Sequence, residues 1–212
     1  MFLRTAVKWC ALSTAIYMLL LADTANAINL NTFEQVIIEG NQPAIKSAVT
    51  EVIQTKSPKF MVRAERLLSG VQKRRAVSLE EKGYRLLLLH HAADASPQSR
   101  DQELWISRAQ YDLGRNYFKQ SLPKEGEKKV KKSIAAERAK AEAEAVTLLT
   151  KATENGHVEA PAVLASIVKK TDLKQAESLL RLSLSRGNAN ASQGLADIKK
   201  TKRLQAVGAN KE

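Results

Sequence analysis

Three histidines are the residues of this 212-residue chain best suited to acid–base or metal chemistry. His90 and His91 are adjacent, so on a helix their side chains would point about 100° apart and would not face one metal ion. His157 stands alone, and the chain has no His-Glu-x-x-His pattern, no Gly-x-Ser-x-Gly turn and no glycine-rich phosphate loop. Glu81 lies three residues after Ser78, a spacing that a helix-capping box explains. The sequence therefore predicts a protein that is not an enzyme and that holds no cofactor and no metal.

Four aromatic residues gather in one segment, where they could bind a peptide or fill a core. They are Trp105, Tyr111, Tyr117 and Phe118. Tyr111 and Phe118 are seven residues apart and share one helical face, with Tyr117 near it. Aromatic side chains dominate binding surfaces, and they also fill cores. Two interpretations stay open: packing in the interior, or a groove in which Tyr111 and Tyr117 receive a partner.

A dense run of lysines could bind an anionic partner. Lys128, Lys129, Lys131 and Lys132 are followed by an alanine-rich stretch of strong helix formers that ends at Ala145. We expect a basic helical insertion over residues 120–140, whose lysines meet lipid head groups, envelope phosphate polymers or an acidic protein. The alternative is a solvated helix whose charges keep the protein soluble.

Apolar spacing and capping residues predict helices along the whole chain. Short polar side chains stand at the expected helix starts, as at Thr32, Ser57-Pro58 and Ser96-Pro97, where they can accept a free backbone N–H. No stretch of the sequence shows the sustained alternation of a β-strand. The expected helices span residues 32–39, 42–55, 58–70, 76–94, 98–119, 127–154, 159–169, 173–186 and 189–202.

An internal repeat organises these helices. Residues 145–156 match residues 176–187, and the two segments end at Gly156 and Gly187, which lie 31 residues apart. A fixed period of this size is typical of a helical solenoid. Each glycine is expected to end a helix in the left-handed conformation. The repeated positions that should hold the stack together are Ala152, Gly156, Ala160, Leu164, Gly187, Ala191 and Leu195.

The same register continues upstream. Ala109, Leu113 and Gly114 fall where Ala160, Leu164 and Ala165 lie in the next unit, with 20 additional residues between the units. Residues 76–203 are therefore predicted to form the repeats, residues 28–75 a helical segment or degenerate repeat, and residues 204–212 a flexible tail. The expected fold is all-α, a short α/α solenoid of stacked antiparallel helix pairs.

The segment Ala109-Gln-Tyr-Asp-Leu-Gly-Arg-Asn-Tyr117 resembles the second-helix signature of Sel-type repeats, which are α/α repeats related to tetratricopeptide repeats. The turns at Gly156 and Gly187 resemble that family's turn between helices, and the resemblance covers residues 76–202. The later units depart from it, since Ala162 and Gln193 replace the first tyrosine. The resemblance implies an exported bacterial scaffold that holds other proteins on a concave surface.

The first 27 residues have the pattern of a secretory signal peptide. Arg4 and Lys8 begin the segment, its apolar run is shorter than the roughly 20 residues of a membrane span, and Ala25-Asn-Ala27 fits a cleavage site. Cleavage after Ala27 would remove Cys10, the only cysteine, and with it any disulfide or thiolate site. We therefore expect an exported protein, periplasmic or secreted; an uncleaved N-terminal anchor is the alternative.

The charge narrows the classes of partner. The net charge of +12 favours anionic ligands, but an exported protein rarely meets nucleic acid, so nucleic acid is not expected. Two functions remain. One is a non-enzymatic scaffold or adaptor that binds a partner protein through the repeat surface; the other is an envelope protein that binds anionic lipid or polymer through its lysines.

Overall fold

The chain folds into helices. The computed structural model describes residues 28–71, 76–123, 127 and 131–209, and none of these residues lies in a β-strand. The helices in chain order are α2 Leu30–Glu39, α3 Gln42–Gln54, α4 Pro58–Val71, α5 Leu79–Ala93, α6 Arg100–Ser121, α7 Lys132–Glu154, α8 Ala160–Val168, α9 Leu173–Ser185 and α10 Ala191–Ala209. The prediction of an all-α protein is confirmed.

The N-terminal helices form the first hydrophobic core. Helices α2 to α5 pack against one another, and α4 and α5 also contact α6. Phe33 of α2, Leu68 of α4 and Leu88 of α5 are almost completely excluded from solvent in this core. Burying a side chain of this size contributes roughly 1.5–3 kcal/mol. Leu113 of α6 belongs to the same core, so residues 28–71 are continuous with the repeats that follow.

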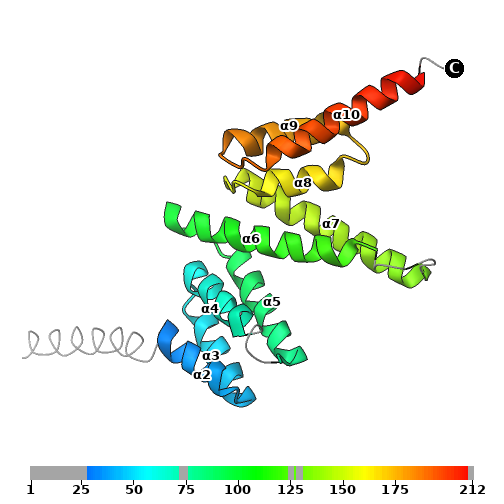
Figure 1. Cartoon of the computed structure of the whole chain (residues 1–212). Coiled ribbons are helices and arrows are strands. Elements are labelled where there is room, and N and C mark those ends of the chain that lie inside the picture. The colour runs from blue at the N-terminus through cyan, green and yellow to red at the C-terminus, as the bar shows by residue number, and fades with distance from the viewer. Residues whose placement is uncertain (1–27, 72–75, 124–126, 128–130, 210–212) are drawn as a thin grey trace, which may run out of the picture.

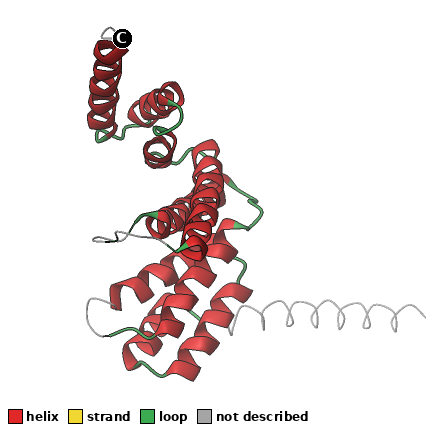
Figure 2. Cartoon of the chain, turned by 90° about the vertical axis from the view of Figure 1, so that its right-hand side faces the viewer, coloured by secondary structure: helices red, strands yellow, loops and turns green. Residues whose placement is uncertain are grey.

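From α5 to α9, each helix packs against the helix before it and the helix after it in the chain. Leu149 and Leu164 lie in a second core shared by α6, α7 and α8, and Leu180 and Ile198 lie in a third core shared by α8, α9 and α10. The chain thus advances from α2 at one end of the molecule to α10 at the other (Figure 1 and Figure 2). The fold is a short α/α solenoid of stacked antiparallel helix pairs, as predicted.

The two glycine turns repeat one geometry. The φ angle is +82° at Gly156 and +96° at Gly187, so both residues are left-handed, as predicted. In each turn the glycine N–H donates to the carbonyl three residues earlier, at 3.1 and 2.9 Å. The next N–H donates to the carbonyl five residues earlier, at 2.9 and 3.0 Å. Matching hydrogen bonds 31 residues apart confirm the register of the repeat.

Most of the predicted repeat positions are buried. The buried members are Ala109, Leu113, Gly114, Ala152, Ala160, Leu164 and Ala191. Leu195 is different, because it is only half-buried at the edge of the third core, which Ile198 enters instead. Helix α10 is the last described element, so no further unit covers its outer face.

Two predicted helix starts are wrong, because a neighbouring residue is the cap. Helix α2 is capped by Asn29, whose Oδ1 accepts the backbone N–H of Thr32 at 2.9 Å. Helix α6 is capped by Ser99 rather than Ser96, and the Ser99 Oγ accepts the N–H of Gln102 at 3.3 Å. This start places two acidic residues in the first turn of α6, where the helix dipole favours negative charge.

Two other predicted helix limits also differ from those in the structure. Helix α7 begins at Lys132 rather than at residue 127, and Lys131 at its N-cap makes no side-chain capping bond. Lysines oppose the positive end of the helix dipole, which disfavours an earlier start. Helix α10 continues to Ala209, past the predicted limit of 202, so most of the expected tail from residue 204 is helical. Its Lys, Leu, Gln and Ala residues are strong helix formers.

The predicted signal peptide, residues 1–27, lies outside the described residues. Among the helices that the structure describes, none combines the length and the apolar character that a membrane crossing requires.

Candidate partner-binding groove

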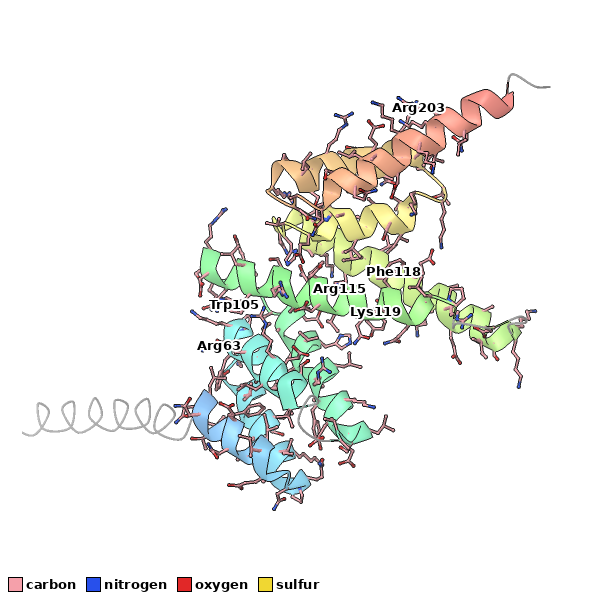
Figure 3. The ribbon with its side chains drawn as sticks, viewed as in Figure 1. Arg63, Trp105, Arg115, Phe118, Lys119 and Arg203 are labelled. Atoms are coloured by element: carbon pink, nitrogen blue, oxygen red, sulfur yellow. The ribbon has the colours of Figure 1, made fainter. Side chains whose placement is uncertain are left out.

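Helix α6 carries a partly exposed stripe between the N-terminal helices and α8. Arg108, Asp112, Arg115 and Lys119 recur every three or four residues, so they share one face of the helix. Arg115 and Lys119 lie one turn apart along α6 (Figure 3). All four residues line a pocket that we name the basic cleft, and Arg115 also borders a second pocket that we name the side hollow. We call the two pockets together the groove over α6.

The basic cleft lies where α6 meets α4 and α5, and its volume is about 500 Å³. Its charged lining residues are the cations Arg66, Arg85, Arg108, Arg115 and Lys119 and the carboxylates Glu65 and Asp112. Cations therefore outnumber carboxylates five to two among these residues. A hollow lined mainly by one sign of charge concentrates ligands of the opposite sign.

An ion pair neutralises the deeper of the two carboxylates. Glu65 is only 5% exposed, and the Arg85 guanidinium donates to its Oε1 from Nε at 2.9 Å and from Nη2 at 2.7 Å. Burial raises the pKa of Glu65 above its ordinary value, and the hydrogen bonds from Arg85 oppose that rise. Glu65 and Arg85 thus neutralise each other's charge within the wall of the cleft.

The second carboxylate is also paired, and three cations of the cleft have no carboxylate partner among the described residues; we call them the free cations. Arg108 donates from Nε to Oδ2 of Asp112 at 3.0 Å. Within the described part of the chain, no carboxylate pairs with Arg66, Arg115 or Lys119. These three cations are available to a ligand.

Aromatic rings support two of the free cations. The Arg66 guanidinium lies 5.8 Å from the centroid of the Trp105 ring, and the Arg115 guanidinium lies 5.4 Å from that of Tyr111. Such cation–π contacts restrict a guanidinium without neutralising its charge.

The side hollow lies across Arg115 from the basic cleft and has a volume of about 410 Å³. Tyr111 and Arg115 border it on α6, and Glu159 and Ser166 border it on the side of α8. The Tyr111 side chain is almost wholly buried, and burial, assisted by the Glu159 carboxylate, raises the pKa of its hydroxyl to about 12. The hydroxyl is therefore neutral at physiological pH.

The two predicted tyrosines have different places. Tyr111 lies in the wall of the side hollow, and the ring of His157 stacks on its own ring. Tyr117 packs between the first and second cores, with its hydroxyl 3.1 Å from Nε2 of His90. The structure therefore brings Tyr111 to the groove and leaves Tyr117 partly buried between the two cores, away from it.

The predicted lysines do not line the groove. Lys131 and Lys132 are exposed at the start of α7, and neither borders the basic cleft or the side hollow. Lys128 and Lys129 lie outside the described residues. Elsewhere in the described ranges, His, Cys, Asp and Glu side chains form no group of three that could hold a metal ion.

Sequence reasoning missed the arginines of the basic cleft. The spacing of Arg108, Arg115 and Lys119 could have indicated part of this cleft, because residues three or four apart share one face of a helix. The contribution of Arg66 and Arg85 could not be predicted from the sequence, because only the packing of α4 and α5 against α6 brings them to the same cavity.

The fold and the groove define an all-α helical-repeat protein with a basic concave surface. Comparison of the chain with known protein families, curated proteins and solved structures finds no match.

Proposed function

We propose that this chain is an exported, non-enzymatic scaffold or adaptor that holds a partner protein in the groove over α6. The observation that carries the proposal is that the basic cleft and the side hollow adjoin at Arg115, a residue of the partly exposed stripe of α6 that lines both. Helical solenoids use extended concave surfaces of this kind to bind proteins. The resemblance to Sel-type repeats and the predicted signal peptide support the same function and an exported location.

The groove contains residue types that carry binding energy in protein interfaces. Arginine and tyrosine are enriched among the few interface residues that dominate affinity. Arg115 and Tyr111 stand side by side on α6, and helices on both sides fix the walls of the groove. A site on rigid elements loses little conformational entropy when a partner binds.

Filling the groove tests the proposal. Ser69→Trp would place a bulky ring in the basic cleft, and Ser166→Trp would do so in the side hollow. Gln175→Trp, on the exposed surface of α9, is the matched control. We expect one protein of the cell envelope to co-purify with the parent and the control and to be lost from both groove variants. Retention of that protein by both groove variants would contradict the proposal.

A second candidate function is binding to anionic envelope lipid or polymer. The exposed lysines Lys131 and Lys132 at the start of α7 favour it, because they can approach a charged surface. Sedimentation with anionic vesicles would then weaken in Lys131→Gln/Lys132→Gln and with added salt. Unchanged sedimentation in both cases would exclude this function.

A further inference from the structure

We propose that the basic cleft binds an acidic segment of the partner protein, rich in aspartate and glutamate. This inference rests on the proposed function, since it assigns the chemistry of the segment that enters the groove. The three cations that have no carboxylate partner among the described residues, Arg66, Arg115 and Lys119, supply the recognition.

The geometry of the charges favours carboxylate ligands. Both carboxylates of the cleft are already hydrogen-bonded, Glu65 to Arg85 and Asp112 to Arg108. An incoming carboxylate therefore meets cations that no carboxylate in the described part of the chain pairs with. A guanidinium presents a planar fork of N–H donors that matches a carboxylate through two parallel hydrogen bonds.

The free arginines are held in position before a ligand arrives. Arg66 lies over the Trp105 ring and Arg115 over the Tyr111 ring. Because aromatic faces support both guanidinium groups, less side-chain entropy is lost when a carboxylate binds. Lys119 lies one turn from Arg115 on the same face of α6 and extends the row of positive charge.

The concave shape distinguishes a peptide from a membrane surface. The free cations line a cavity bounded by α4, α5 and α6, which a peptide side chain can enter. Arg66, Arg115 and Lys119 are exposed, as Lys132 is, but unlike Lys132 they line one cavity, whose shape suits a peptide side chain better than a plane of head groups. Asn116 in the same lining offers an amide that can hydrogen-bond to a peptide backbone.

The test measures binding of a fluorescent oligoglutamate peptide to the full chain by anisotropy, with oligoglutamine of equal length as the uncharged probe. We expect oligoglutamate alone to bind, and its affinity to fall with added salt. Arg66→Gln/Arg115→Gln/Lys119→Gln should weaken binding roughly tenfold or more, because each substitution removes a charge that faces the ligand.

The matched control removes the same charge elsewhere. Lys140→Gln/Lys151→Gln/Lys174→Gln takes three exposed cations from α7 and α9, outside the cleft, and should leave the affinity within about twofold of the parent. Thermal melting checks that both triple variants fold, and Lys119→Gln alone, at an exposed position, should still lower the affinity measurably.

Four results would overturn the inference: no binding of oligoglutamate, equal binding of oligoglutamine, equal loss in both triple variants, or preferential capture of phosphatidylglycerol vesicles by the cleft cations. A failure of the proposed function looks different. In that case oligoglutamate would bind the cleft as expected, but Ser69→Trp and Ser166→Trp would not change what co-purifies from cells.

Discussion

The imidazole ring of His157 stacks on the phenol ring of Tyr111, with ring centroids 4.1 Å apart and ring planes inclined by 21°. His157 belongs to the turn between α7 and α8, and Tyr111 belongs to α6. The stack therefore joins successive units of the solenoid at the wall of the side hollow. Arg108 and Arg115 also lie over the Tyr111 ring, at 5.5 and 5.4 Å.

The stack should make the stability of the protein depend on pH. Burial and the charge of Arg108 lower the pKa of His157 from 6.5 to about 4, so the fold keeps the ring neutral. Between these pH values the unfolded chain binds more protons than the folded chain. The stabilisation by the neutral ring is therefore complete above pH 6.5 and is lost as the pH falls towards 4.

His157→Gln tests this dependence. The variant should lose less stability than the parent between pH 6.5 and about pH 4, and because the ring is partly exposed we expect a difference of only roughly 1 kcal/mol. Urea unfolding of both proteins at the two ends of this range measures it. Identical pH dependence in parent and variant would show that His157 is not kept neutral by the fold.

The close packing of α6 on α7 should not tolerate a side chain at Gly114. A Cβ atom there would lie 2.8 Å from Cγ of Leu149, which is fully buried. Gly114→Ala should therefore destabilise the protein by roughly 1–3 kcal/mol, through overpacking. Gly83→Ala is the control, because a Cβ at this site in α5 meets nothing within 4 Å and should stabilise the helix by roughly 0.5–1 kcal/mol. Equal effects of the two substitutions in chemical denaturation would contradict the packing of these helices.

The turn at Gly187 should resist substitution for a different reason. A Cβ there meets no atom within 4 Å, so a cost can come only from the left-handed φ of +96°. Gly187→Ala should cost about 1 kcal/mol, and Gly187→Asn should cost less, because asparagine tolerates this conformation better. Melting temperatures of the two variants provide the comparison. If Gly187→Ala melts at the same temperature as Gly187→Asn, the left-handed conformation assigned to this turn is wrong.

The Glu65–Arg85 ion pair in the wall of the basic cleft should matter for the stability of the fold at neutral pH. Arg85→Gln would leave the buried Glu65 carboxylate without its cation, at a cost of roughly 2–3 kcal/mol, given that Arg85 is partly exposed. Burial raises the pKa of Glu65, so protonation at lower pH should relieve part of this cost. Unfolding of Arg85→Gln near pH 7 and near pH 4 measures the difference, and Glu65→Gln/Arg85→Gln should recover most of the stability. If the loss of stability in Arg85→Gln does not depend on pH, the unpaired Glu65 carboxylate is not its cause.

The sequence predicted the helices well, because their signals are local. Gly156 and Gly187 ended helices where expected, and the Ser78–Glu81 capping box is present. The predicted helix limits were wrong where two residues could cap the same helix, as Ser96 and Ser99 could at the start of α6. The basic cleft could not be predicted, because its cations come from three helices that meet only in the folded chain.

Crosslinking in living cells tests the central claim most directly. A photo-crosslinking amino acid would replace Asn116 in the basic cleft, Ser166 in the side hollow, or Gln175 on the exposed surface of α9. A partner held in the groove over α6 should give the same adduct from positions 116 and 166 and none from position 175. Absence of a discrete adduct from both groove positions, or equal labelling from position 175, would contradict the account.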